Sequence, residues 1–264
     1  MLFVEGDNKK FSALTIISRI IPVSLKKIIY RIGSYLVRDL DDISIRHPSM
    51  YWSLRNLKRL GYNPRSVIDV GAYHGNWTKM MKTVFPDCNI LMIEAQPGKE
   101  EIIRRVRDQY DGSVKYDINI LGSSDKQEVT FFEMESGSSV FEEISSYPRT
   151  KTKRQTTTLD LVAKRHNFDK PDFLKLDVQG FELEVLRGAI TLIPSIEIML
   201  LEVSLAHFNE GAPLFNEVIE FMKERRFVPY DICSLMRRPS DKALCHVDII
   251  FVKQNSFLFK QTGA

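Results

Sequence analysis

Residues 66–75 join a short apolar strand to two glycines, and this combination constrains the fold more than any other stretch of the sequence. The apolar run predicts a buried strand that ends at Gly71, and a second glycine, Gly75, precedes an expected helix over 76–85. Glycine lets a backbone turn tightly and approach a ligand with no Cβ in the way. The stretch therefore predicts the first unit of a doubly wound sheet, in which ligands bind beyond the carboxyl ends of the strands.

The acidic residues around this turn indicate the kind of ligand. The spacing is Gly-x-x-x-Gly, which differs from the Gly-x-Gly-x-x-Gly of dinucleotide sites. Asp69 stands inside the turn, where a carboxylate repels phosphate and suits a cationic or amino-bearing ligand. S-adenosylmethionine fits that description, because it carries a sulfonium and an amino group and lacks phosphate.

Glu94 strengthens this interpretation. It ends the next predicted strand, about 25 residues after Asp69, a position from which an acidic side chain accepts hydrogen bonds from ribose hydroxyls. The alternative is that Glu94 only caps the helix after Pro97. The turn that precedes it favours ribose binding.

The composition is that of an ordinary soluble globular protein. The chain has 264 residues, 44% hydrophobic and 27% charged, which allows one α/β domain plus an extension. A net charge of +3 gives no argument for a nucleic-acid partner. The three cysteines lie far apart and predict reduced core residues in a reducing compartment, which favours a cytoplasmic location. A divalent metal cofactor stays open as an alternative, although no residue pattern supports one. No run reaches the ~18 apolar residues of a membrane span.

The N-terminal part, residues 1–47, is expected to be a helical, amphipathic extension to a domain over 48–264. Its segment 11–38 is apolar with interspersed Lys and Arg, a pattern that can lie peripherally on the inner face of an anionic membrane. The alternative is a cap whose apolar face packs on the domain or on a second subunit, as in a homodimer. The cap interpretation is favoured, because globular helices show this pattern more often.

From residue 66 onward, strand and helix patterns alternate. The class expected is α/β: a doubly wound, seven-stranded, mostly parallel sheet with a C-terminal antiparallel strand. The short polar loop before the last strand leaves no room for a crossover helix, so the last two strands must pair antiparallel. The expected strands are 66–70, 89–94, 114–118, 172–177, 196–203, 227–233 and 246–253. The expected helices are 48–61, 76–85, 97–110, 158–167, 180–192 and 213–226.

Residues 119–157 interrupt this alternation. They are polar, β-branched and rich in Gly and Ser, and only 127–134 predicts an additional strand. An insertion above the carboxyl edge of such a sheet is commonly a lid or a recognition element. A decorative hairpin is the alternative.

Charged residues recur at the predicted carboxyl edge. Lys175 and Asp177 share one face of their strand by the two-residue period. A lysine in a central strand is costly unless its ammonium is paired. Asp177 and Glu202, which ends a neighbouring strand, are the candidate partners. Four strands thus deliver charge to one edge, which indicates a functional site.

Several motifs together resemble the FkbM-type family of S-adenosylmethionine-dependent methyltransferases. The resemblance covers about residues 48–253 and is most specific in the block Lys-x-Asp-x-x-Gly-x-Glu-x-x-x-Leu-x-Gly-Ala over 175–189. Val67–Gly75, Ile93–Pro97, Thr156–Asp160 and Leu201–Ser204 also match family motifs. Gln179 departs from the pattern, since the family often has Glu there, and we give it no catalytic role. The resemblance implies O-methylation of a sugar or another small hydroxyl compound, often in surface polysaccharide or natural-product assembly.

The turn, the second strand and the resemblance give a set of candidate site residues. Asp69 is expected near the amino group of the cofactor and Glu94 at the ribose. The other expected cofactor contacts are Gly71, Ala72, Tyr73, Gly75, Asn76, Ala95, Leu121, Gly122 and Asp177.

A hydroxyl is a poor nucleophile at neutral pH, so a general base is expected. The candidates are Asp177, Glu202 and His207. We assign Lys175 to Asp177 and expect Glu202, assisted by His207, to be the base. A rival hypothesis is a non-catalytic module that keeps this fold and docks on a membrane-associated glycan-assembly complex.

Overall fold

The computed structural model describes residues 48–238 and 240–261. The chain divides into two compact units, Met1–His47 and Pro48–Ala264. The expectations for residues 1–47, including membrane or subunit contact through 11–38, fall outside the described residues. In the part that is described, no helix is long and apolar enough to cross a bilayer.

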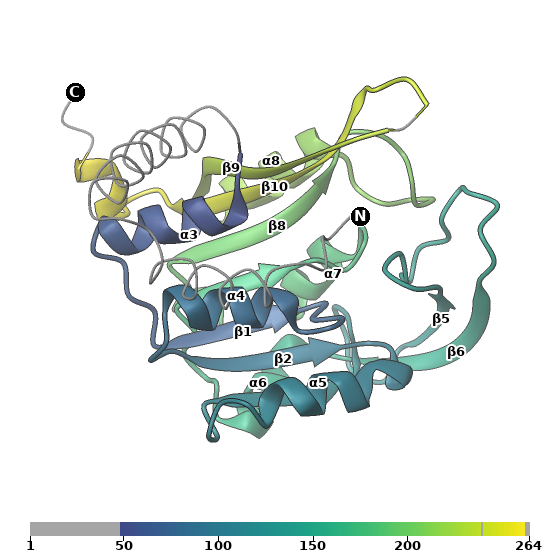
Figure 1. Cartoon of the computed structure of the whole chain (residues 1–264). Helices are drawn as coiled ribbons and strands as arrows, with labels where there is room; N and C mark the ends of the chain where they lie inside the picture. Colours follow the sequence, from purple (N-terminus) through teal and green to yellow (C-terminus); the bar gives the residue numbers. More distant parts are fainter. Residues whose placement is uncertain (1–47, 239, 262–264) are drawn as a thin grey trace, which may run out of the picture. The chain divides into compact units, whose positions relative to one another are not determined.

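Seven strands form one sheet in the order β3-β2-β1-β7-β8-β10-β9 (Figure 1). β1, β2, β3, β7 and β8 run parallel, and β10 lies antiparallel to both β8 and β9. The predicted fold class is therefore confirmed. The strand order reverses between β1 and β7, the kind of crevice where such sheets bind ligands. The strands are β1 (Ser66–Val70), β2 (Asn89–Glu94), β3 (Val114–Ile118), β7 (Phe173–Leu176), β8 (Ile198–Ser204), β9 (Phe227–Arg237) and β10 (Leu244–Lys253).

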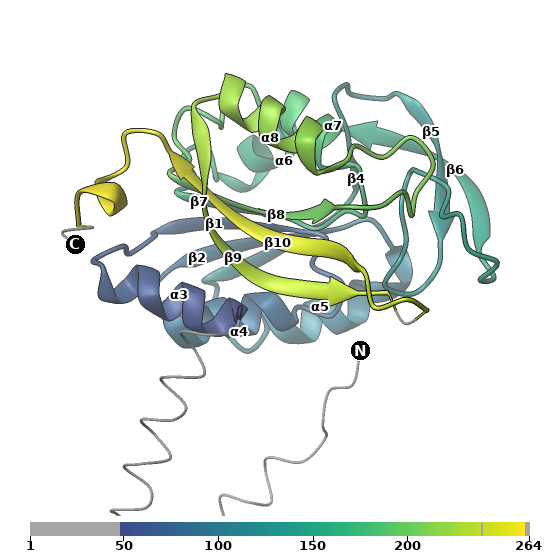
Figure 2. The same ribbon diagram turned by 90° about the horizontal axis from the view of Figure 1, so that it is seen from above.

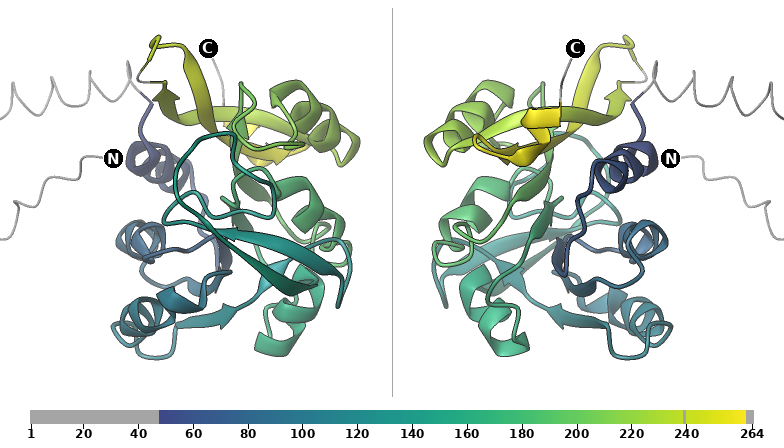
Figure 3. Two further views of the ribbon diagram at one scale, coloured as in Figure 1. Left: turned by 90° about the vertical axis from the view of Figure 1, so that its right-hand side faces the viewer. Right: turned by 90° about the vertical axis from the view of Figure 1, so that its left-hand side faces the viewer.

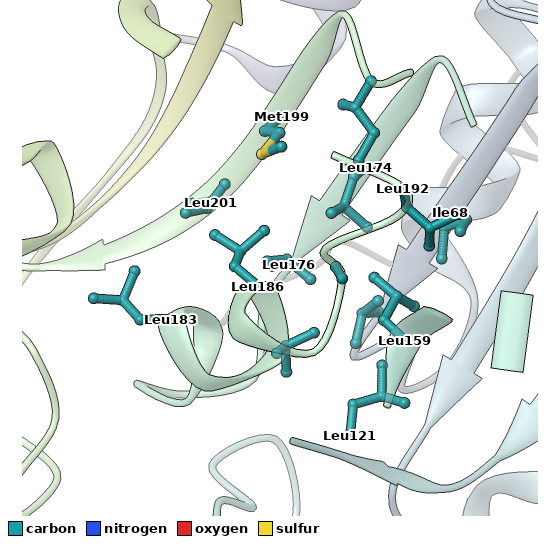
Figure 4. Packing of buried hydrophobic residues seen from close by; sticks show 14 of the residues in the cluster. Ile68, Leu121, Leu159, Leu174, Leu176, Leu183, Leu186, Leu192, Met199 and Leu201 are labelled. Carbon is teal, nitrogen blue, oxygen red and sulfur yellow. The ribbon is translucent and has the colours of Figure 1, made fainter. Parts of the chain in front are cut away.

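Helices cover both faces of this sheet (Figure 2). One face carries α3 (Met50–Arg59), α4 (Asn76–Val84) and α5 (Glu100–Arg107), and the other α6 (Leu159–His166), α7 (Glu182–Arg187) and α8 (Phe215–Glu224). Burying apolar strand and helix side chains between these layers is the main favourable term in folding. Figure 4 shows part of this core, where Leu176 and Leu201 of the sheet face Leu186 of α7.

Two predicted helices are shorter in the structure. The segment 97–110 begins with a 3₁₀ turn, Pro97–Lys99, before α5 starts. The helix predicted over 180–192 is α7 alone, which ends with Gly188 as its C-cap residue. At this glycine the chain passes close to another backbone. A Cβ on Gly188 would lie 2.1 Å from the carbonyl oxygen of Gly122.

The insertion forms a second, three-stranded sheet of β4 (Ile120–Leu121), β5 (Glu128–Glu133) and β6 (Thr150–Thr157). The sequence predicts β5 but not β6, whose residues are Thr, Lys, Arg and Gln without an apolar alternation. The connection between β5 and β6 passes across the carboxyl ends of the main strands (Figure 3, left). This placement agrees with the position expected for the insertion.

Gly71 holds the turn after β1 against the end of β7. Its φ of 73° lies in the left-handed region, and a Cβ there would stand 1.8 Å from the carbonyl oxygen of Asp177. The glycine is therefore required by contact between two backbones of the protein, in addition to any ligand that approaches the turn.

Replacing Gly71 by Ala should destabilise the fold strongly. The matched control is Gly112→Ala, because Gly112 has a similar φ of 79° and no atom within 4 Å of its added Cβ. Backbone strain alone should cost the control about 1–2 kcal/mol. Overpacking should add about 1–3 kcal/mol at Gly71. Urea denaturation measures both, and equal losses would contradict the backbone contact.

Candidate active site

The Lys175 ammonium lies at the centre of the carboxyl edge. This side chain is 6% exposed, and its Nζ lies 3.1 Å from Oδ1 of Asp69 and 3.4 Å from Oδ2 of Asp177. It also donates a hydrogen bond of 2.9 Å to the carbonyl oxygen of Gly71. Burial alone would lower the pKa of Lys175, but the two carboxylates outweigh burial and hold that pKa above its ordinary value. The ammonium thus joins β1 to β7.

Asp69 is the closer of the two partners, whereas the sequence analysis assigns Lys175 to Asp177. Asp69 is fully buried, and its Oδ2 accepts a hydrogen bond of 2.7 Å from the hydroxyl of Thr78 on α4. Its carboxylate therefore links the first strand to the first helix. Two contacts leave acceptor positions on this carboxylate, and its contact with the amino group of a cofactor stays a prediction.

Glu94 ends β2 beneath the glycine turn and is 4% exposed. Its carboxylate accepts hydrogen bonds from the backbone N–H of Tyr73 at 2.8 Å and of Gln96 at 2.9 Å. Tyr73 has a left-handed φ of 49°. Burial raises the pKa of Glu94, and these N–H groups oppose the rise. A carboxylate has about four acceptor positions, so Glu94 keeps capacity for ribose hydroxyls.

Tyr73 also connects this turn to the insertion. Its hydroxyl donates to Oε2 of Glu135 at 2.8 Å, and Nζ of Lys99 lies 2.7 Å from the same oxygen. Gln96 donates from its side chain to the carbonyl oxygen of Glu135 at 3.2 Å. One residue of the insertion therefore contacts the loops after both β1 and β2.

Gln179 connects the two acidic candidates of the site. Its Nε2 lies 3.1 Å from Oδ1 of Asp177 and 2.7 Å from Oε2 of Glu202, and its backbone is left-handed with a φ of 55°. The amide donates to both carboxylates, whereas a carboxylate in its place would repel them. The sequence analysis gives this residue no role, although its departure from the family pattern is a visible signal.

Glu182 fixes the turn that presents Gln179. Its buried carboxylate accepts hydrogen bonds from the backbone N–H groups of Val178 at 2.9 Å and of Gly180 at 3.2 Å. Burial raises the pKa of Glu182 to about 7. The first residue of α7 thus shapes the loop that lies over the end of β7.

Glu202 is near the end of β8, and its side chain is 19% exposed. Burial, and after it the charges of Asp177 and Asp248, raise the pKa of Glu202 well above its ordinary value. The nearest histidine is His246 of β10, whose Nδ1 lies 3.7 Å from Oε1 of Glu202. His207 is exposed in the loop after β8, and among the described residues nothing pairs it with Glu202. The predicted assistance of Glu202 by His207 stays a prediction, and the structure brings His246, which was not among the predicted site residues, close to Glu202.

The insertion lies over this acidic group. The hydroxyl of Ser139 donates to the carbonyl oxygen of Gln179 at 2.9 Å, and the backbone N–H of Ile144 donates to the carbonyl oxygen of Phe208 at 2.7 Å. The side chain of Asn209 donates to the carbonyl oxygen of Phe141 at 3.2 Å. The arch over 134–149 is therefore fastened to the loops after β7 and β8.

The remaining expected cofactor contacts lie around the turn and along its flank. Gly75 and Asn76 begin α4, and Ala72 is buried behind the turn. The carbonyl oxygen of Ala95 accepts a hydrogen bond from Arg154, and Leu121 belongs to the apolar core, beside Gly122. Their contact with a cofactor stays a prediction. No cluster of three or more His, Cys, Asp or Glu side chains with metal-binding geometry occurs in 48–238 and 240–261.

The charge balance of this edge fits S-adenosylmethionine. Lys175 is a buried cation of this edge, and Asp69 is the closer of its two carboxylate partners. Asp177 and Glu202 therefore leave an excess of negative charge, which favours a cationic ligand. Glu94, with free acceptor positions, supplies a place for ribose hydroxyls.

Removing the ammonium should destabilise the protein far more than removing an exposed one. Lys175→Met would leave Asp69 buried without its cation, a defect that costs about 3–5 kcal/mol. The matched control is Lys153→Met, which breaks an exposed pair with Glu128 and should change stability by about 0.5 kcal/mol or less. Urea denaturation of both variants measures the difference, and similar losses would show that Lys175 does not hold the edge together.

Comparison with known proteins identifies the family. The model of the Methyltransferase FkbM domain matches residues 69–229, which include the glycine turn, Glu94, Lys175, Asp177 and Glu202. A comparison with curated proteins found no match.

Solved structures with a similar fold include several methyltransferases. The 1,6-didemethyltoxoflavin-N1-methyltransferase of Burkholderia thailandensis is 11% identical, with a TM-score of 0.43, and the match covers 89% of this chain and 92% of that one. The precorrin-6y C5,15-methyltransferase of Geobacter metallireducens is 11% identical, with a TM-score of 0.41, and the match covers 75% of this chain and 85% of that one. An O-methyltransferase family protein of Burkholderia thailandensis is 10% identical, with a TM-score of 0.44, and the match covers 77% of this chain and 55% of that one. These likenesses concern the fold alone, and the family match identifies the chain as a member of the FkbM family of S-adenosylmethionine-dependent methyltransferases.

Proposed function

We propose that this protein transfers a methyl group from S-adenosylmethionine to a hydroxyl of a small molecule, a sugar or glycan precursor. The observation that carries the proposal is the Glu202 carboxylate, which is partly exposed and has a raised pKa. A carboxylate whose pKa is raised is a stronger base than an ordinary one, so it is better suited to take a proton from a hydroxyl. O-methylation needs such a group.

The residues at the carboxyl edge divide into a cofactor side and an acceptor side. Glu94 and the turn that contains Tyr73 would hold the cofactor, which supplies an electrophilic methyl group when bound. Glu202 would take the proton that the acceptor hydroxyl loses. Gln179 donates to Glu202 Oε2 and so keeps that carboxylate in one orientation. Holding the reacting groups in line lowers the barrier further.

A sugar acceptor suits the chemistry of the acceptor side. Asp177, whose side chain is 39% exposed, and Glu202 offer acidic oxygens that can accept hydrogen bonds from several hydroxyls. The aromatic ring of Phe208 stands in the same region, against His246. Carboxylates beside an apolar ring match a ligand with both hydroxyl groups and C–H surfaces. The excess of negative charge also favours an uncharged acceptor over an anionic one.

Glu202→Gln should lower turnover by about 10²-fold or more, the usual scale for loss of a general base, and leave cofactor affinity unchanged. Methyl transfer from labelled S-adenosylmethionine to a panel of sugars measures turnover, and calorimetry measures cofactor affinity. Activity of the wild type should rise with pH through the raised pKa of Glu202, because only the carboxylate accepts a proton. The activity of Glu202→Gln should lack this rise with pH.

The matched control is Glu197→Gln, at the opposite end of β8, which should keep both activity and pH profile. Normal turnover in Glu202→Gln, beside an inactive Asp177→Asn that still binds cofactor, would make Asp177 the base. If no hydroxyl compound in the panel accepts a methyl group while an amine does, the proposal of O-methylation is wrong.

A further inference from the structure

His246 lies where the sheet register brings it to the acidic site. In the antiparallel pair of β8 and β10, Asp248 stands opposite Glu202 and His246 opposite Ser204. Side chains two residues apart on a strand share a face, so His246 is the diagonal neighbour of Glu202 on the same side of the sheet. The C-terminal hairpin therefore adds a titratable group to the ends of the parallel strands.

The imidazole is buried and lacks a partner on one side. His246 is 8% exposed, and its Nδ1 is a buried atom without a hydrogen bond to any described residue. The nearest acceptor recorded for Nδ1 is Oε1 of Glu202, at 3.7 Å. A buried polar atom without a partner is costly, so this nitrogen calls for an explanation.

The two oxygens of Glu202 are in different states. Oε2 already accepts a hydrogen bond of 2.7 Å from Gln179, while Oε1 faces Nδ1 of His246. A small side-chain rotation would turn the 3.7 Å approach into a hydrogen bond from an Nδ1–H group. Glu202 would then have one donor on each oxygen and a fixed orientation.

We propose that His246 is a positioning residue for Glu202, and that its Nδ1–H donates to Oε1 of the carboxylate. This proposal rests on the proposed function, in which Glu202 accepts the proton. A donated hydrogen bond favours the ionised carboxylate and opposes the rise in the Glu202 pKa that burial causes. His246 thus favours the ionised form of this partly exposed carboxylate, which is the form that acts as a base.

The other groups around the imidazole are acidic or aromatic. Asp177 after β7 and Glu143 of the arch both favour the protonated imidazole. The ring of Phe208 packs edge-on against the imidazole, with 4.7 Å between the two ring centroids. Burial works in the opposite direction and lowers the pKa of His246. Asp248 lies on the same strand face. At neutral pH these conditions favour a neutral ring with its proton on Nδ1, beside the carboxylate.

Nitrogen NMR of the full chain, labelled at its five histidines, tests the proposal without any acceptor. His246→Asn identifies the signal of His246. We expect the Nδ1–H tautomer in the wild type, and in Glu202→Gln a fall in the His246 pKa by about 1 unit, the lower end of the effect of an opposite charge within ~4–6 Å. The matched control is Glu143→Gln, which removes another of the acidic side chains that act on His246 and should shift this pKa less. The Nε2–H tautomer, or an unchanged titration in Glu202→Gln, would overturn the proposal.

Two substitutions at His246 separate positioning from packing. The amide nitrogen of Asn can take the place of Nδ1 as a donor, whereas Leu fills the space without one. With cofactor and a sugar acceptor, the activity of His246→Asn should rise over the same pH range as that of the wild type, and the activity of His246→Leu should rise at higher pH. If activity rises over the same pH range in both variants, the positioning role is refuted. A chain with the expected NMR behaviour but no O-methylation would instead refute the proposed function.

Discussion

The buried ammonium of Lys175 is the interaction on which the carboxyl edge depends. It lies between Asp69 of β1 and Asp177 after β7, where the strand order of the sheet reverses. Burying one charge unpaired would be expensive, so the lysine and Asp69 require each other. Asp69 in turn holds Thr78 of α4. The position of the first strand, its helix and the adjacent turn therefore follows from one cation.

The same cation sets the chemistry of the edge. The ammonium pairs with Asp69 and Asp177, while burial of Glu202 outweighs the attraction of Lys175 and raises the pKa of that carboxyl. Neutral donors then orient the Glu202 carboxylate, with Gln179 on one oxygen and, as we infer, His246 on the other. Such an arrangement supplies a carboxylate that is fixed in position and still basic. This is the property that deprotonation of a hydroxyl requires.

The sequence predicts the sheet, its antiparallel end and the family, because strand and helix periods and motif spacing are local patterns. It also predicts that Asp69, Glu94, Lys175 and Glu202 reach one edge. It does not predict that Lys175 lies closer to Asp69 than to Asp177, because that depends on how β1 and β7 align. His246 is missed for the same reason, since only the register of β8 with β10 brings it to Glu202. The strand β6 carries polar side chains and pairs through its backbone, which composition does not reveal.

Calorimetric titration with S-adenosylmethionine, and with NADH in parallel, tests whether the carboxyl edge holds this cofactor. We expect saturable binding of S-adenosylmethionine and weaker or no binding of NADH. Glu94→Ala should weaken S-adenosylmethionine by about 1.5–3 kcal/mol, the range for a hydrogen bond to a charged group. Wild-type affinity in Glu94→Ala would place the cofactor elsewhere. NADH binding tighter than S-adenosylmethionine would contradict the account as a whole.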